Sequence, residues 1–566
     1  MLSHVNFDII FLHPPALYDF RKRIMFPGVI AHTVADSTHQ FIVFPVGLLS
    51  MAEYLARNGY RVAIDNLGER MLEKSEFDAE SYLEKVDARV YAIDLHWCTH
   101  SQGAVEIAKI CKRLHSNSFV LLGGLTSTCF HEEIVLKYPF IDGILRGEAE
   151  EPLLKLLQTL EAQRSLREVP NLTYRDGSRK VANALSHPCS TLDDLDFTRL
   201  DLVTPRRAPV FERASIPVCR GCLYNCVSCG GSAYSYRKMF GRESPAFRSP
   251  GKILEDLHRL DEQGVRVVFL FQDARMGGPK YWKELVNALK SDKSNIETIS
   301  MELFEPPPAD FLRSLADLKE RITLTISPES GVDHVRKAHG RIYTNQEILS
   351  TARLCRRLGL RLTVFFMIGL AGESHETMEQ TSRLWEEFYS LSRPRHHELT
   401  SGGGAVRHGM GSMILLDPGS LAFDNPEKYG YRLFFKNVED YIEGMSMPSW
   451  HQWVSYETTT LTRTEIAKLT LDSFVESIRV REKYGAHETP EQASEQYFLM
   501  RIDRMLIDEV DRAMRVADTR ERLDRLKALS ESLASYPQTT DADPYGYRLA
   551  IKAAMLESVG LLDASY

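Results

Sequence analysis

The sequence of 566 residues lacks several features that mark common classes of protein. No stretch approaches the ~20 consecutive apolar residues of a membrane-spanning helix, so we expect no membrane association. The first residues carry no basic segment, apolar core or cleavage site, which favours a cytoplasmic protein. Lysine and arginine are scattered and the net charge is −8, so nucleic acid is not expected as a partner. Cysteines number only nine, and four of them cluster, which fits a metal site better than a disulfide framework.

The first 185 residues alternate short apolar runs with amphipathic segments, which predicts βαβ units around a parallel, Rossmann-like sheet. No Gly-x-Gly-x-x-Gly follows the first expected strand, so a dinucleotide ligand is disfavoured. Ligands of doubly wound domains bind beyond the carboxyl ends of the strands. The expected strands are Phe7–Leu12, Arg61–Asn66, Val90–Leu95, Phe119–Leu122 and Ile141–Leu145. The turns at that edge are His13-Pro14-Pro15, Phe44-Pro45-Val46-Gly47, His96-Trp97-Cys98-Thr99, Gly123-Gly124 and Gly147-Glu148-Ala149-Glu150.

A second α/β series begins at residue 213, after a segment over 186–212 whose prolines and acidic run predict a linker that packs poorly. Six β/α units are too few for a closed eight-stranded barrel and predict a partial (β/α)6 TIM barrel over 213–435. From 436 to 566 the pattern becomes mainly helical. The expected barrel strands are Ala214–Val218, Val267–Phe271, Thr298–Leu303, Ile322–Ile326, Leu362–Ile368 and Met413–Leu416. The fold class is therefore α/β, with a helical region at the end.

One short segment holds Cys219, Cys222, Cys226 and Cys229, and the last three have the spacing C-x3-C-x2-C. Three thiolates can hold three irons of a [4Fe–4S] cluster and leave the fourth iron open to a small chelating ligand. A zinc site that uses all four thiols and a closed four-cysteine electron-transfer cluster are the alternatives. Zinc sites usually place a longer loop between their pairs, which favours the open cluster with Cys219 as a buried bystander.

The cysteine spacing resembles that of the radical S-adenosylmethionine (SAM) superfamily, whose open iron binds the amino and carboxylate groups of SAM. Later strand ends carry similar markers: Phe271-Gln272-Asp273, Ser327-Pro328-Glu329-Ser330-Gly331, Arg341-Ile342-Tyr343-Thr344, Met367-Ile368-Gly369-Leu370-Ala371-Gly372-Glu373 and Leu416-Asp417-Pro418-Gly419-Ser420. The resemblance implies a [4Fe–4S] cluster held by Cys222, Cys226 and Cys229. It also implies SAM contacts from Ser228, Gln272, Asp273, Glu329, Arg341 and Met367. A buried Glu329 needs a polar partner, which is either SAM or a salt bridge to Arg336 or Arg341. Ser228 departs from the pattern, because an aromatic residue usually precedes the last cysteine.

The turns of the first domain, over roughly residues 5–160, resemble the cobalamin-binding domain that precedes many radical SAM domains. The Asp-x-His-x-x-Gly motif that supplies an axial histidine in other cobalamin proteins is missing, and His96 is its nearest imitation. We therefore expect cobalamin without a protein nitrogen beneath the cobalt. The resemblance implies cobalamin contacts from Pro14, Pro15, Val46, Trp97, Thr99, Gly123, Gly124, Gly147 and Glu148.

The whole chain thus resembles cobalamin-dependent radical SAM methyltransferases, and in length and layout the pyrrole C-methyltransferases of aminocoumarin antibiotic biosynthesis. The resemblance implies methylation of an unactivated carbon of a small natural product, free or carrier-linked, with methylcobalamin as the intermediate methyl carrier. It also implies an electron donor such as flavodoxin or ferredoxin. Trp450, Trp453 and Tyr456 form an aromatic cluster suited to stacking on a flat heteroaromatic substrate, with interdomain packing as the alternative.

Two other functions stay open at this point. One is a cobalamin-dependent radical SAM enzyme that catalyses a rearrangement or cyclisation without methylation. The other is a sensor or redox protein that binds cobalamin and an iron–sulfur cluster but never cleaves SAM.

Overall fold

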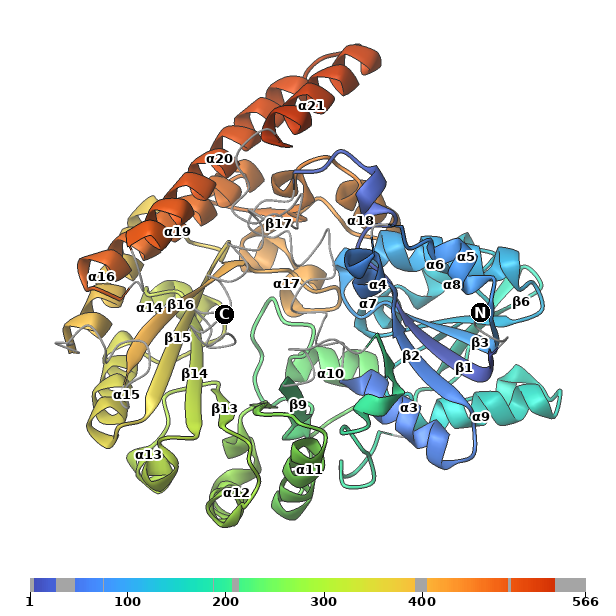
Figure 1. The fold of residues 1–566 in the computed structure, drawn as a ribbon, viewed down its shortest axis with the longest axis horizontal. Helices are drawn as coiled ribbons and strands as arrows, with labels where there is room; N and C mark the ends of the chain where they lie inside the picture. Colours follow the sequence, from blue (N-terminus) through green and yellow to red (C-terminus); the bar gives the residue numbers. More distant parts are fainter. Residues whose placement is uncertain are drawn as a thin grey trace.

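The computed structural model describes the greater part of the chain in three packed regions (Figure 1). The described residues are 5–26, 46–74, 76–186, 188–205, 213–391, 405–486 and 490–534. Phe44 and Pro45 of one predicted ligand turn lie outside them. No helix in these ranges is long and apolar enough to cross a membrane.

The first region is an eight-stranded sheet with the order β7-β6-β5-β4-β3-β1-β2-β8. All pairs are parallel except those of β6 with β5 and with β7. The sub-order 2-1-3-4-5 is that of flavodoxin-like folds, whose ligand crevice lies between the first and third strands. The five expected strands are present, and the three strands at the sheet edges were not predicted. The strands are β1 (Val5–His13), β2 (Val62–Asn66), β3 (Val86–Asp94), β4 (Phe119–Gly123), β5 (Gly143–Leu145), β6 (Leu172–Asp176), β7 (Arg179–Ala182) and β8 (Val203–Thr204).

Helices cover both faces of this sheet (Figure 1). On one side α3 (Gly47–Arg57) packs beside α9 (Glu150–Glu161), and on the other lie α5 (Ala79–Leu83), α6 (Ser101–Leu114) and α8 (His131–Lys137). Helix α3 buries Leu48, Leu49, Ala52 and Leu55 on one face, as their helical spacing predicts. Shorter helices α4 (Leu67–Glu73) and α7 (Leu125–Cys129) lie at the carboxyl ends of β2 and β4.

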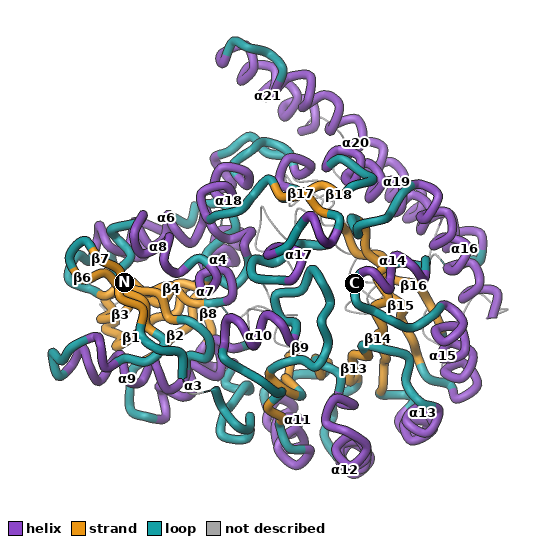
Figure 2. Tube along the Cα trace, turned by 180° about the vertical axis from the view of Figure 1, so that it is seen from behind, coloured by secondary structure: helices purple, strands orange, loops and turns teal. Residues whose placement is uncertain are grey.

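The second region confirms the partial barrel. Six parallel strands have the order β16-β15-β14-β13-β12-β9, with the helices on the outside (Figure 2). The last strand is Val406–Met413, so the prediction of Met413–Leu416 was wrong because that apolar run follows the strand. The strands are β9 (Arg213–Pro217), β12 (Val267–Phe271), β13 (Thr298–Leu303), β14 (Ile322–Glu329), β15 (Arg361–Ile368) and β16 (Val406–Met413). The helices are α11 (Pro250–Glu262), α12 (Gly278–Ser291), α13 (Ala309–Leu315), α14 (Asp333–Ala338), α15 (Asn345–Leu358) and α16 (His375–Leu391).

The segment between the two regions is packed, and the expectation that it packs poorly was wrong for its described residues. Leu192, Leu195 and Phe197 are buried in a cluster of their own, and β8 joins the first sheet. The buried guanidinium of Arg248 donates to the carbonyl oxygens of Leu192 and Leu195. The segment is therefore stabilised by a charged side chain that lies more than 50 residues away in sequence. The composition of the segment alone does not indicate this contact.

The third region is mainly helical, as predicted. Helix α18 (Val438–Met445) lies next to α6 of the first region, and α19 (Arg463–Lys483) packs along α20 (Pro490–Met514). Helices α20 and α21 (Thr519–Ala534) form a long arm along one side of the molecule (Figures 1 and 2). Two short strands, β17 (Tyr431–Leu433) and β18 (Tyr456–Thr458), pair between these helices and the barrel.

Replacing Arg248 by methionine is expected to destabilise the protein more than any exposed arginine substitution. Arg248 and Asp256 form a fully buried ion pair, and removal of one partner leaves a buried charge at a cost of about 3–5 kcal/mol. Scanning fluorimetry should show a midpoint lower by several degrees. The matched control is Arg383→Met, which removes an exposed pair with Glu379 and should leave the midpoint nearly unchanged.

Candidate functional site

The three predicted ligand cysteines lie in one half-buried loop after β9. The amide N of Tyr224 donates to Cys222 Sγ at 3.4 Å, and the amide N of Gly231 donates to Cys229 Sγ at 3.3 Å. Hydrogen bonds of this kind stabilise sulfur that carries negative charge and adjust the potential of iron–sulfur clusters. Burial raises the pKa of Cys222 to about 11, so a metal must displace a proton from this thiol.

Cys219 occupies a different environment. It lies in β10 (Cys219–Arg220), which pairs with β11 (Ala246–Phe247), and its thiol is buried 3.7 Å from the carbonyl oxygen of Gly221. In the described part of the chain no three His, Cys, Asp or Glu side chains converge closely enough for one metal ion. A four-iron cluster spreads its thiolates over separate irons, so it does not require them to converge on one ion.

Two residues at the ends of barrel strands have left-handed backbone conformations. Gln272 follows β12 with φ 75°, and Glu329 ends β14 with φ 67°. Such strain is uncommon outside glycine and accumulates at functional sites. Gln272 Oε1 and Glu329 Oε2 are both buried without a hydrogen-bond partner. A ligand with an ammonium or hydroxyl group, such as SAM, fits these two acceptors.

Arg341 contacts the same carboxylate. Its Nη2 donates to Glu329 Oε1 at 2.9 Å and its Nη1 to the carbonyl oxygen of Phe304 at 3.2 Å. The predicted salt bridge of Glu329 is therefore made by Arg341, while Arg336 binds other groups. Burial raises the pKa of Glu329, and Arg341 opposes that shift. Only one oxygen of Glu329 is occupied, so the salt bridge and a ligand contact are compatible.

The other predicted SAM residues differ in whether their side chains already have protein partners. Asp273 Oδ1 accepts hydrogen bonds from the amide and Nε of Arg275, and its Oδ2 accepts one from the amide of Phe304. The Asp273 carboxylate therefore stabilises the loop that follows β12. Ser228 is buried with its hydroxyl 3.3 Å from His339 Nε2. Met367 alternates with Phe366, whose ring packs on Trp385 of α16 outside the barrel, so Met367 faces the interior. As SAM contacts, all three stay predictions.

The carboxyl edge of the first sheet brings the predicted cobalamin residues together at the switch point. Pro14 and Pro15 are buried, and a side chain at Gly103 of α6 would meet the Pro15 carbonyl oxygen at 1.8 Å. Gly124 has φ 112°, and a Cβ there would lie 2.6 Å from the amide N of His96. The hydroxyl of Thr99 is buried without a hydrogen-bond partner. The two glycines let the backbone segments of this edge pack closely together. The unpartnered Thr99 hydroxyl is the group at this edge that a ligand could use.

The other predicted cobalamin residues lie along the same edge. His96 and Trp97 are half-buried, with their rings edge to face at a centroid distance of 4.5 Å. Burial lowers the pKa of His96, so its imidazole is neutral at neutral pH. Val46 is the N-cap residue of α3, and Gly123 ends β4. No comparison or contact tests their role toward cobalamin, so it stays a prediction.

The two carboxyl edges face each other. A Cβ on Gly230, next to Cys229, would lie 2.8 Å from Leu125 Cδ2, one residue beyond the Gly123-Gly124 turn. Gly147, after β5, lies close to Phe240 at the end of α10 (Ala233–Phe240). The turns that follow β4 and β5 thus abut the cysteine loop and the helix after it.

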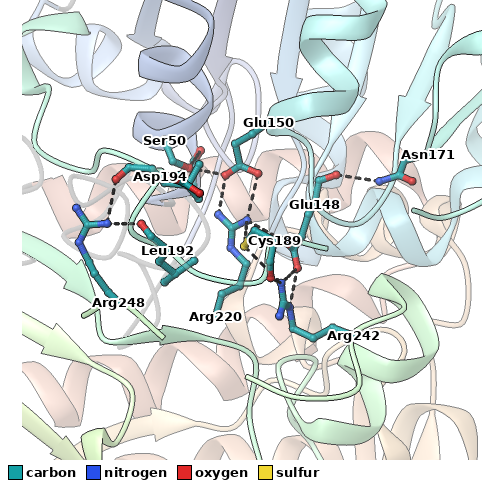
Figure 3. Close-up of polar contacts among 12 residues, drawn as sticks. Ser50, Glu148, Glu150, Asn171, Cys189, Leu192, Asp194, Arg220, Arg242 and Arg248 are labelled. Carbon is teal, nitrogen blue, oxygen red and sulfur yellow. Dashed lines mark hydrogen bonds and ion pairs between the residues drawn. The ribbon is translucent and has the colours of Figure 1, made fainter. Parts of the chain in front are cut away.

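Glu148 makes a contact that the sequence did not reveal (Figure 3). Arg242 Nε donates to Glu148 Oε1 at 2.6 Å and Arg220 Nη1 to Glu148 Oε2 at 3.1 Å. Arg220 Nη2 also donates to Glu150 Oε1 at 2.6 Å. The Glu148 carboxylate, which was predicted to bind cobalamin, is therefore paired with two arginines of the second domain. These partners are 70 to 94 residues apart in sequence, so spacing gives no signal for them.

Asp417 is another site residue, and its role was not predicted from the sequence. Its Oδ2 accepts from the amide of Gly230 at 2.8 Å, and its own amide donates to the carbonyl oxygen of Ser228 at 3.1 Å. Asp417 therefore forms hydrogen bonds with the backbone of the residues on both sides of Cys229. Burial raises the pKa of Asp417 to about 6. The Leu416–Ser420 marker in the sequence was the available signal.

The predicted substrate cluster is enclosed. Trp450, Trp453 and Tyr456 are 1%, 2% and 1% exposed. Trp453 Nε1 donates to the carbonyl oxygen of Met447 at 2.6 Å, and the Tyr456 hydroxyl donates to that of Ile414 at 3.0 Å. The Tyr456 contact joins the helical region to the barrel region, whereas the Trp453 contact is local to the helical region. A substrate role for the three residues stays a prediction.

The fold and the site together define a class: proteins that join a doubly wound ligand domain to a partial barrel with an iron–sulfur loop. Comparison with family models agrees with this. Residues 33–157 match the B12 binding domain and residues 216–384 match the Radical SAM superfamily. The chain is a radical SAM protein with a B12-binding domain, as its sequence predicted. The cofactors of these two domains are a [4Fe–4S] cluster, SAM and cobalamin.

Individual relatives share modest identity. An uncharacterized methyltransferase of Pyrococcus horikoshii is 23% identical over 341 residues, which cover 60% of this chain and 72% of the relative. An anaerobic magnesium-protoporphyrin IX monomethyl ester cyclase of Cereibacter sphaeroides is 24% identical over 303 residues, or 50% and 47% of the two chains. The radical SAM methyltransferase TsrM of Kitasatospora setae has the same fold, with a TM-score of 0.56, 14% identity and coverage of 93% and 99%.

Cys222→Ala is expected to abolish cluster binding, whereas Cys219→Ala is expected to retain it. Iron and sulfide per chain after anaerobic reconstitution should fall from about four to near zero in the first variant only. The buried helical Cys355→Ala serves as a control for loss of a buried thiol. Loss of iron in both loop variants would favour a closed four-cysteine site.

Glu329→Gln is expected to weaken SAM binding roughly 10- to 100-fold, the equivalent of about 1.5–3 kcal/mol for a charge-assisted hydrogen bond. Equilibrium dialysis of labelled SAM against the anaerobically reconstituted protein measures this affinity. Glu347→Gln, an exposed capping residue of α15, is the control. An unchanged dissociation constant would contradict the assignment of Glu329 to the SAM site.

Proposed function

We propose that this protein is a cobalamin-dependent radical SAM methyltransferase that methylates a carbon atom of a small molecule. The observation that carries the proposal is the contact between the two carboxyl edges, at Leu125 and Gly230. When bound, the cluster and SAM supply radical chemistry and cobalamin supplies a methyl carrier. Two such cofactors act on one substrate only if their binding edges face each other within one enclosed site.

The residues of the chain have separate roles in this proposal. Cys222, Cys226 and Cys229 hold the cluster and leave one iron open. Gln272 Oε1 and Glu329 Oε2 accept hydrogen bonds from SAM and orient it, since no protein group occupies them. The turns around Gly230 pack directly on Leu125 and Asp417, which holds the two edges together.

The finer parts of the proposal concern the partners. The substrate is a natural product that contains a pyrrole or another heteroaromatic ring. This choice of substrate rests on the resemblance of the sequence and not on the buried tryptophans. The electron donor is external, such as flavodoxin or ferredoxin. Leu223, between two of the cluster cysteines, is 55% exposed and gives such a donor an approach to the loop.

A cyclase or another non-methylating enzyme is the second candidate. The observation that favours it is the 24% identity to the magnesium-protoporphyrin cyclase, which covers only about half of either chain. The relative of Pyrococcus horikoshii, named a methyltransferase, is covered over 72% of its length, and this favours methyl transfer.

Anaerobic turnover with SAM labelled in its methyl group is expected to place the label on a carbon of the product. The reaction is followed by mass spectrometry with candidate heteroaromatic substrates, and Cys222→Ala is the inactive control. A product without label would establish the non-methylating candidate. Failure to cleave or demethylate SAM with any substrate would favour a sensor.

A further inference from the structure

The four residues Glu148, Glu150, Arg220 and Arg242 form a network that we call the interdomain latch (Figure 3). Arg220 lies in β10, two residues before Cys222, and Arg242 follows Gly241, the left-handed cap of α10. Both arginines bind Glu148, one through each carboxylate oxygen. The latch therefore holds both ends of the 220–242 segment, which contains all three cluster cysteines.

The latch is largely shielded from water. The side chains of Arg220, Glu148, Glu150 and Arg242 are 16%, 4%, 10% and 5% exposed. Burial alone would raise the pKa of Glu150, but Arg220 lowers it by a larger amount. The net pKa lies below its usual value, so the carboxyl is ionised at neutral pH. Separating buried charges from their partners is strongly unfavourable, so the two domains resist separation here.

Both sides of the latch are anchored to rigid elements. The hydroxyl of Ser50 in α3 donates to Glu150 Oε1 at 2.8 Å, and the amide of Cys189 donates to Glu148 Oε2 at 2.9 Å. Asn171 Nδ2 donates to the carbonyl oxygen of Glu148 at 2.9 Å. On the barrel side, Arg220 is paired in register with Ala246 of β11. A continuous set of hydrogen bonds thus connects the first sheet to the strand that precedes the cysteine loop.

We propose that the interdomain latch sets the position of the cysteine loop relative to the carboxyl edge of the B12-binding sheet. Its four members are positioning residues, because they act through the loop and the sheet edge rather than on the substrate. The inference rests on the proposed methyl transfer, whose reacting groups come from the two sides. Small displacements of reacting groups lower rates steeply, so a broken latch slows methylation while each side retains its cofactor.

The test compares Glu148→Gln, Glu150→Gln and the double variant with Glu439→Gln. Glu439 of α18 pairs with Lys137 of α8, so this pair joins the first region to the helical region instead of to the barrel. Its side chains are 48% and 38% exposed, and both are distant in sequence from the cysteines. We expect the double variant to keep the iron content and the cobalamin absorption of the wild type after reconstitution. Its methylated product per unit time should fall about 10²-fold. Hydrogen exchange should rise over 143–150 and 219–231, with no change in Glu439→Gln.

The conservative variant Arg220→Lys separates a positioning role from simple loss of stability. Lysine keeps the charge but not the two-pronged geometry, so methylation should be intermediate between the wild type and Arg220→Met. Unchanged methylation together with unchanged exchange in the double variant overturns the inference, as does an equal loss in Glu439→Gln. If the double variant fails to fold, exchange and methylation in the two single variants decide in the same way. If the wild type methylates nothing, the proposed function fails, and the exchange measurement still decides whether the latch holds the two sides together.

Discussion

The contact between two carboxyl edges is the constraint on which the rest of the structure depends. In each domain the parallel strands end in turns that can hold a large ligand, and Leu125 and Gly230 bring those turns together. The packed 188–205 segment, the α6–α18 contact and the interdomain latch all hold this arrangement. A loose connection would leave two separate binding domains instead of one site.

Within the barrel, the site depends on local strain and on unused acceptors. Gln272 and Glu329 adopt left-handed conformations that a non-glycine residue avoids, and the sheet around them holds them there. Their free oxygens lie in an environment where an unpartnered polar atom is costly. A ligand that donates to both atoms would remove that cost, and the proposed SAM contacts rest on this argument.

Much of the fold could be predicted from the sequence because parallel strands are buried on both faces and appear as continuous apolar runs. Strands β12 and β13 agree with their predicted bounds. The polar edge strand β7 carries no such run and was not predicted. Strand β16 contains two glycines and a histidine, and its predicted position was wrong. The cysteine spacing identified the loop, but the partners of Glu148 and Asp417 are distant in sequence and emerge only from the packing of the domains.

The central claim is that one chain holds both cofactors in one site. Electron paramagnetic resonance of the protein reconstituted with iron, sulfide and cobalamin, with both centres reduced to their one-electron paramagnetic states, tests it most directly. The account predicts a magnetic interaction between the two centres, which is lost in Cys222→Ala. Two independent spectra that simply add, or a chain that binds only one of the centres, would contradict it.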